Sequence, residues 1–193
     1  MNFPPYINTP VMFDPKTGLA DSQPPLERHY SDMKNMYLDE EARQKLEDNG
    51  NALLYHFYDF GVPEKEGDLA FGTSIVYPGK VGNEYHMTNG HFHTILDTAE
   101  IYLCQAGYGM MMMESPEGEV IFKEMRPGQS VYVPGRYAHR SINLSDTETL
   151  ITFYVFRADA GHDYGSIKTK GFRKIVVENN GSWEVRDNPR WKA

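Results

Sequence analysis

Short apolar-rich runs alternate with turn-forming segments along most of the chain, from Ala52 to Phe156. The runs read ALLYHFYDF, LAFGTSIVY, EYHMTNGHFH, AEIYLCQA, GMMMMES, EVIFKEM, SVYVP, AHRSIN and TLITFYVF. Between them stand YPGK, SPEGE, RPGQ and PGRY, whose prolines and glycines favour turns. Many short strands at this spacing predict an all-β antiparallel sandwich or barrel. Near the C-terminus, KIVVENNGSWEV predicts one more hairpin, which turns at Asn180-Gly181.

The N-terminal part of the chain lacks this pattern of short strands and turns. Residues 1 to about 30 are rich in proline and predict an extended arm that lies over the barrel or over a neighbouring subunit. A short helix follows, with Asp39 as its N-cap, acidic residues in its first turn and Gly50 after its end. We therefore expect one domain made of an arm and helix (1–50), a barrel (51–160) and a C-terminal loop and hairpin that pack on the barrel (161–193).

The composition narrows the range of partners. Of 193 residues, 13% are aromatic and 24% are charged, which is typical of a globular chain. No apolar run is long enough for a membrane span, and we expect no secretory signal. A lone cysteine, Cys104, indicates a reducing, cytoplasmic setting and is expected to be a small core residue. A net charge of -8 argues against nucleic-acid binding, but it leaves room for a small anionic substrate.

Two histidines separated by one residue, His91 and His93, stand out in TNGHFHTILDTAEIYLC. On a strand both rings would project from the same face. A turn around Leu96-Asp97-Thr98 would place Glu100 on the next strand, which we expect to return beside the first. His139 lies further along, in GQSVYVPGRYAHRSIN. Most such histidine pairs are surface or hydrogen-bonded residues. Three imidazoles and a carboxylate, however, suit a first-row divalent metal such as iron, manganese, nickel or zinc, with open positions for chemistry.

These residues resemble the paired motifs of the cupin superfamily. The first motif, HxH followed by Glu and Gly at six-residue gaps, is met by His91, His93, Glu100 and Gly107. The second is met by Gly128, Pro134, His139 and Asn143. Tyr85 replaces a usual glycine, and the inner glycine of the second motif is displaced to Gly135. The resemblance implies a cupin fold, a double-stranded β-helix or jelly-roll barrel, with the arm and short helix added to it.

Longer blocks, including FGTSIVYPGKVGNEYHMTNGHFH, ADAGHDYG and DNPRW, resemble the cupin-type phosphoglucose isomerases. The resemblance implies a homodimer with one divalent metal per subunit, Fe²⁺ foremost, that interconverts glucose 6-phosphate and fructose 6-phosphate. It assigns His91, His93, Glu100 and His139 to the metal, Ser74, Thr88 and Gly90 to the phosphate end, and Tyr102 and His162 to the sugar. Glu100, Tyr102 and His162 are the candidate catalytic residues.

Three positions depart from that family. Asn89 stands where a lysine is common, Phe156 replaces a tyrosine, and Arg136 replaces an aromatic residue, so that Arg136 becomes a candidate for holding the anion. On their own, Ser74, Thr88 and Gly90 are ordinary strand and turn residues. Glu100 is the expected base for proton transfer between the carbons. If it cannot leave the metal, a metal-assisted hydride shift is the better mechanism.

Two other functions fit the same metal ligands. A metal-dependent cupin dioxygenase would use iron to activate oxygen, and a non-catalytic cupin would only bind a sugar or another small molecule. Fold alone does not choose among them. The phosphate-end set of Ser74, Thr88 and Gly90 favours the isomerase, because a dioxygenase for apolar substrates needs no phosphate donors.

Overall fold

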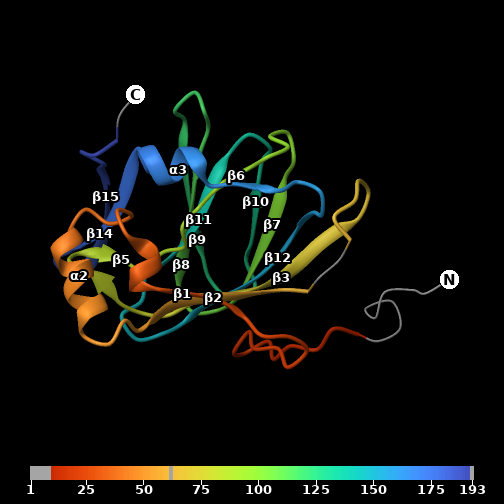
Figure 1. The fold of residues 1–193 in the computed structure, drawn as a ribbon, viewed down its shortest axis with the longest axis horizontal. Helices are drawn as coiled ribbons and strands as arrows, with labels where there is room; N and C mark the ends of the chain where they lie inside the picture. The colour runs from red at the N-terminus through yellow and green to blue at the C-terminus, as the bar shows by residue number, and fades with distance from the viewer. Residues whose placement is uncertain (1–9, 61–62, 192–193) are drawn as a thin grey trace.

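A computed structural model of the chain describes residues 10–60 and 63–191. Within these ranges the strands form a barrel of antiparallel sheets (Figure 1). The larger sheet has the order β1 (Leu26–His29), β2 (Leu53–Asp59), β3 (Leu69–Val76), β12 (Leu150–Arg157), β7 (Glu100–Ala106) and β10 (Ser130–Val133). The smaller one has the order β11 (Ala138–Asn143), β8 (Gly109–Glu114) and β9 (Val120–Met125). The predicted all-β barrel of antiparallel strands is confirmed.

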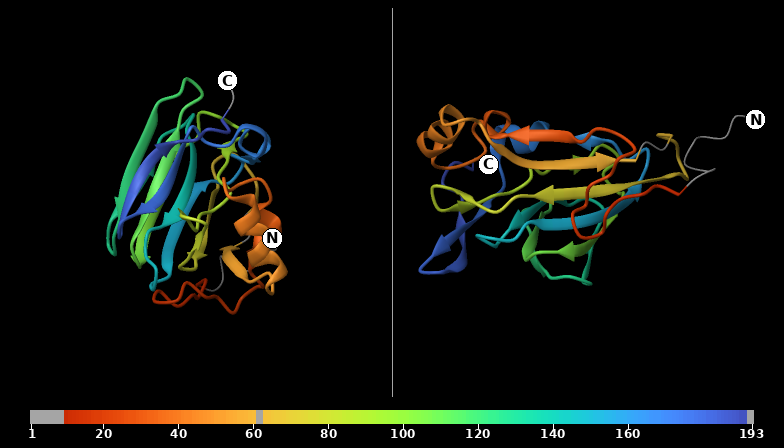
Figure 2. Two further views of the ribbon diagram at one scale, coloured as in Figure 1. Left: turned by 90° about the vertical axis from the view of Figure 1, so that its left-hand side faces the viewer. Right: turned by 90° about the horizontal axis from the view of Figure 1, so that it is seen from below.

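The barrel interior is filled from both sheets. Met110 to Met113 on β8 are at most 2% exposed, so the methionine run is part of the core, as predicted. Cys104 on β7 is fully buried and is a free thiol. Burial of these apolar side chains is the main force that holds the two sheets together. Figure 2, left, shows the green strands and the blue C-terminal hairpin on one side, and the orange N-terminal strands and helix on the other.

The N-terminal segment joins the barrel at two places. Phe13 stacks on Phe60 and Phe153, with ring centroids 5.8 and 5.7 Å apart, and so covers the outer face of the large sheet. The end of the expected arm forms β1, which pairs with β2 and so lies on the barrel, whereas residues 1–9 lie outside the described ranges. A 3₁₀ turn, η1 (Tyr30–Met33), then leads toward helix α2 (Glu40–Asp48). The Asp39 carboxylate accepts the backbone N–H of Ala42 at 2.8 Å, which confirms the predicted N-cap.

The C-terminal part adds the predicted hairpin. Strands β14 (Lys174–Asn179) and β15 (Ser182–Asp187) pair around Asn180 and Gly181, which have φ of 51° and 81°. Positive φ at both central residues is the geometry of a two-residue hairpin turn. Before it lie β13 (His162–Asp163) and helix α3 (Gly165–Lys170). None of the helices in the described ranges has the length and apolar character to cross a bilayer.

One predicted strand is wrong. EYHMTNGHFH is not continuous: it contains β5 (Glu84–Tyr85) and β6 (Phe92–His93), with a turn between them. The interruption falls at Gly90, whose φ of 74° lies outside the range of strands. The expected pairing of the two ligand strands is wrong as well. β6 pairs with β13, whereas β7 pairs with β12 and β10. A two-residue strand, β4 (Lys80–Val81), pairs with β5.

Candidate metal centre

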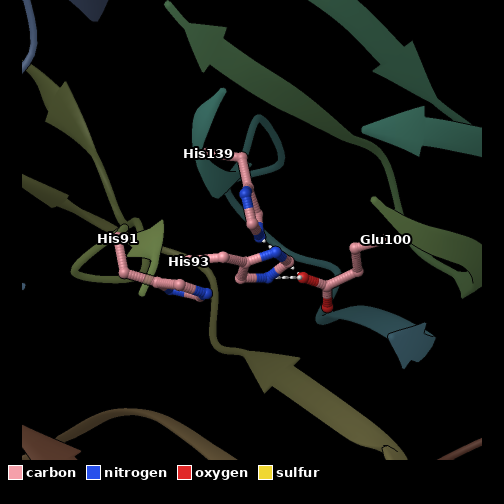
Figure 3. Close-up of side chains that lie close together, drawn as sticks. All are labelled: His91, His93, Glu100 and His139. Carbon is pink, nitrogen blue, oxygen red and sulfur yellow. Dashed lines mark hydrogen bonds and ion pairs between the residues drawn. The ribbon is translucent and has the colours of Figure 1, made fainter. Parts of the chain in front are cut away.

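The four predicted metal ligands meet at one point inside the barrel. His91 and His139 are joined by a β-bridge, His93 ends β6, and Glu100 begins β7. One ligand atom from each residue lies within 4.8 Å of the others. Figure 3 shows the three imidazoles and the carboxylate pointing toward one another. The barrel therefore brings residues from separate strands to a common centre, although β6 and β7 are not neighbours.

Glu100 contacts two of the three histidines of this cluster. Its Oε2 lies 2.9 Å from His139 Nε2 and 3.2 Å from His93 Nε2, and the residue is only 3% exposed. Burial alone would raise the pKa of Glu100, but the charge and hydrogen bonds of His139 and His93 together outweigh it and hold this pKa well below its usual range. The carboxyl group is therefore ionised and can serve as a metal ligand.

The far sides of two imidazoles are fixed by hydrogen bonds. His93 Nδ1 lies 3.0 Å from Thr98 O and 2.8 Å from Thr98 Oγ1. His139 Nδ1 lies 3.3 Å from Tyr137 O. When Nδ1–H donates to a carbonyl, the proton on Nε2 that faces Glu100 is the one that a metal would displace, and this arrangement typically orients histidine ligands of metals. Both Nε2 atoms face Glu100, so the tautomers suit a metal between them.

His91 completes the case for a metal. Its Nε2 is buried and has no hydrogen-bond partner among the residues that the structure describes. Burial, with the nearby His139 and His162, holds the pKa of His91 well below its usual value, so the ring is neutral. A buried nitrogen lone pair without a donor is costly unless a ligand occupies it. Three imidazole nitrogens and a carboxylate fit a first-row divalent cation, and the set is common to iron, manganese, nickel and zinc.

A cavity opens beside the centre and contains the other predicted site residues. His91 and Glu100 line it, so a bound cation would face this space. The remaining predicted residues that line it are Ser74, Thr88, Gly90, Tyr102 and His162. His162 lies opposite His93 in the pairing of β13 with β6, and its ring centroid is 4.4 Å from that of His91. The cavity wall thus holds the predicted substrate residues together with two of the four predicted metal ligands.

The turn at Thr88–Gly90 forms part of the cavity wall and is held from several sides. Thr88 Oγ1 accepts the Ser141 backbone N–H at 3.1 Å, and Arg140 donates to the Asn89 carbonyl at 2.6 Å. A Cβ at Gly90 would lie 2.7 Å from the Phe172 ring and 3.0 Å from the His139 carbonyl oxygen. Glycine is required here by both space and backbone conformation.

The three departures from the family pattern have different outcomes. Asn89 and Phe156 line the cavity, and Phe156 stacks on His93 with ring centroids 5.7 Å apart. Arg136 is exposed, has φ of 74° and donates to Glu117 at 2.6 Å. It lies outside the cavity wall, so the expectation that Arg136 holds an anion there is wrong. Its side chain lies at the surface, where it forms an ion pair with Glu117.

Several cavity residues were missed by sequence reasoning. They are Tyr55, Phe57, Asp59, Ser141, Tyr154 and Tyr164. Three of them alternate along β2, but this strand is largely buried on both faces, so ALLYHFYDF gave no period-two signal of which face lines the cavity. Tyr164 lies two positions after His162 in GHDYG, a segment already singled out. Tyr102 is 8% exposed, and burial, followed by the charge of Glu100, raises the pKa of its hydroxyl well above the usual value. Tyr102 is therefore a neutral hydrogen-bonding group.

Known proteins are similar in sequence to this chain over most of its length. The family described as glucose-6-phosphate isomerase (GPI) matches residues 27–192. A glucose-6-phosphate isomerase of Thermococcus litoralis is 49% identical over 94% of this chain and 95% of its own length. The same enzyme of Pyrococcus furiosus is 46% identical over 94% and 96%. A putative glucose-6-phosphate isomerase 1 of Rhizobium meliloti is 38% identical over 93% and 85%. This chain belongs to the glucose-6-phosphate isomerase family.

Proposed function

We propose that this chain is a metal-dependent aldose-ketose isomerase that interconverts glucose 6-phosphate and fructose 6-phosphate. The family membership supports the reaction. In the structure, one observation supports this reaction most directly. The cluster of His91, His93, Glu100 and His139 borders a cavity whose wall also contains the Thr88–Gly90 turn. This arrangement supports a substrate orientation with the carbonyl end at the metal centre and the phosphate end at the turn.

The reaction moves one hydrogen between C1 and C2 and one proton between the two oxygens. A divalent metal held by the four ligands would polarise these oxygens and stabilise the negative charge that develops on them. Glu100 is ionised and lies at the cavity wall, which supports its proposed role as the base that takes the proton from one carbon and returns it to the next. Tyr102, on the same face of β7, offers a neutral hydroxyl to a sugar oxygen. His162 lines the same cavity, beside His91.

The finer assignments are part of the same proposal. We propose Fe²⁺ as the resident metal, one per subunit, with manganese, nickel and zinc as the competitors, and a homodimer in the cytoplasm. The donor set supports a divalent cation. The buried free thiol of Cys104 supports a reducing compartment. We retain Ser74, Thr88 and Gly90 for the phosphate end, because all three line the cavity.

The test is a coupled assay for glucose 6-phosphate formation from fructose 6-phosphate, before and after chelation. Turnover should vanish with the metal and return when one of the four metals is added. Absence of turnover with every metal would rule the isomerase out, and oxygen uptake with a trial substrate would favour the dioxygenase instead. Binding of fructose 6-phosphate without turnover would leave the non-catalytic cupin.

The role of Glu100 needs a separate measurement. Glu100→Gln keeps the shape of the side chain but removes its basicity, so turnover should fall at least about 100-fold, the lower range for loss of a general base. Metal content is measured alongside, and Glu148→Gln, an exposed glutamate, is the control. Incorporation of solvent deuterium into the product indicates proton transfer by a base. Product without solvent deuterium would favour the hydride shift.

A further inference from the structure

The cavity beside the metal centre has a wall of neutral donors at its phosphate end. Ser74 and Thr88 contribute hydroxyls there, and Asn89 contributes an amide. Among the described residues, no lysine or arginine lines this cavity. A phosphate monoester carries about -1.5 to -2 charge at pH 7, and charge-assisted hydrogen bonds are roughly twice as strong as neutral ones. A positively charged side chain just outside this wall would therefore strengthen phosphate binding.

A second, adjoining cavity of about 260 Å³ supplies it. Arg28, Asp32, Asn89, Tyr164 and Lys168 line this space. Two of these residues, Asn89 and Tyr164, line the main cavity as well. The adjoining space therefore meets the main cavity at the Thr88–Gly90 turn and brings two cationic side chains next to it.

Arg28 is directed to this place by the register of the large sheet. It pairs with Tyr55 across β1 and β2, and directly opposite residues of paired strands project from the same face. Tyr55 lines the main cavity, and its hydroxyl accepts the Asn89 N–H at 3.3 Å. The Arg28 guanidinium lies 5.9 Å from the ring centroid of Phe57, the next cavity residue along β2. Arg28 therefore borders the phosphate end of the cavity.

Lys168 reaches the same place from helix α3. Its Nζ lies 5.6 Å from the ring centroid of Tyr164, so each cation stands by an aromatic ring of the main cavity wall. Neither Arg28 nor Lys168 forms an ion pair with any carboxylate in the described ranges. Asp32 is the one acidic residue in the wall of the adjoining cavity, and its carboxylate accepts the His29 backbone N–H at 2.8 Å.

We propose that Arg28 and Lys168, together with Asn89, form an anion subsite that holds the phosphate of the substrate and selects phosphorylated over plain sugars. The subsite rests on the proposed function, which it deepens. In a chain of net charge -8, two unpaired cations at one end of the cavity also attract the anionic end of the substrate to that side. The sugar then extends along β2, from Tyr55 toward the metal centre.

The experiment measures binding and turnover in Arg28→Gln, Lys168→Gln and the double variant. Lys170→Gln is the matched control, because it removes the same charge from the same helix but lies outside this subsite. Calorimetric affinity for fructose 6-phosphate and for inorganic phosphate should fall at least about tenfold in each single variant, as expected when a hydrogen bond to a charged group is lost. KM should rise likewise while kcat stays within about threefold, and Arg28→Lys should retain most of the affinity.

Unchanged affinity and KM in the double variant, within about twofold of the unmodified protein, would overturn the subsite. Failure of the unmodified protein to bind either anion would overturn it as well. If the protein binds both anions through Arg28 and Lys168 but shows no turnover with any metal, the subsite stands and the proposed isomerase fails. Lys168 is exposed, so its variant tests the proposal even if a change at Arg28 disturbs the β1 strand.

Discussion

The hydroxyl of Thr98 lies 2.8 Å from Nδ1 of His93, inside the turn that separates two of the predicted metal ligands. Because the same hydroxyl donates to the Ile95 carbonyl at 2.7 Å, it acts as an acceptor toward the imidazole. Thr98 therefore fixes both the ring orientation and the tautomer of His93, although it does not reach the centre itself.

Thr98→Val should weaken metal binding about 10- to 100-fold, because loss of an outer hydrogen bond to a histidine ligand typically has that effect. Titration of the apoprotein with a divalent metal measures the affinity. Thr152→Val is the matched control, since the buried Thr152 hydroxyl has no partner within the described ranges. Equal metal affinities in the two variants would contradict the role of Thr98.

Gly90→Ala should destabilise the fold and impair substrate binding, whereas Gly128→Ala should do less. Both glycines have positive φ, 74° and 86°. A Cβ at Gly90 would lie 2.7 Å from the Phe172 ring, but around Gly128 the space is open. We expect a loss of about 1 kcal/mol for the backbone strain at Gly128 and about 1–3 kcal/mol more at Gly90. Urea denaturation of both variants checks the difference, and equal losses would show that the turn can yield.

Arg140 is expected to hold the cavity wall from behind. It is 4% exposed, lies 4.3 Å from the Phe172 ring centroid and donates to the Asn89 carbonyl. Arg140→Met would leave that carbonyl unpaired, so the unfolding free energy should fall by about 1–3 kcal/mol and KM for fructose 6-phosphate should rise. Arg126→Met is the control, because the exposed Arg126 also lies over a ring, 4.1 Å from the centroid of Tyr108. Similar effects of both changes would refute a specific role.

His86 should make the fold sensitive to acid. Burial lowers its pKa from 6.5 to about 4, and its Nε2 lies 3.1 Å from the Tyr30 hydroxyl. The unfolded chain therefore binds the proton more readily, so stability is lost as the pH falls from about 6.5 to 4, by at most about 3 kcal/mol.

His86→Gln should flatten this dependence when the unfolding free energy is measured from pH 7 to 4. Glu84 acts in the opposite sense, because burial raises its pKa to about 6, and the stability that its protonation adds is lost as the pH rises from about 4.5 to 6. Both proteins in the comparison retain Glu84, so its contribution cancels. Parallel pH profiles would show that His86 is not the source.

The sequence predicted which four residues converge at the centre better than it predicted the walls around them. In a barrel, residues at this spacing point toward a common centre. The four residues could therefore be identified without knowing which strands pair: His91, His93, Glu100 and His139. The pairing itself was missed, because β6 is two residues long and Gly90 breaks the run before it. Nothing in the local sequence indicates that β6 takes β13 as its partner.

The substrate side was harder to predict for a physical reason. Strand β2 is largely buried on both faces, so its apolar pattern does not reveal that Tyr55, Phe57 and Asp59 face the cavity. Arg136 was wrongly predicted to reach the anion. The direction of its side chain depends on a positive backbone φ, which is uncommon for arginine and could not be predicted from the sequence. Arg28 enters only through the register of β1 with β2, a relationship between segments that the linear sequence does not contain.

The β1–β2 pairing therefore has an evolutionary consequence. The four predicted metal ligands fall between residues 91 and 139, whereas Arg28, Tyr55 and Lys168, which border the far end of the cavity, come from β1, β2 and α3, on either side of that segment. Exchange of the outer segments would then change the groups that meet the substrate and leave the four predicted metal ligands in place. Chimaeras that graft the first 60 residues and α3 from one relative onto the central barrel of another would separate substrate choice from catalysis within a single small chain.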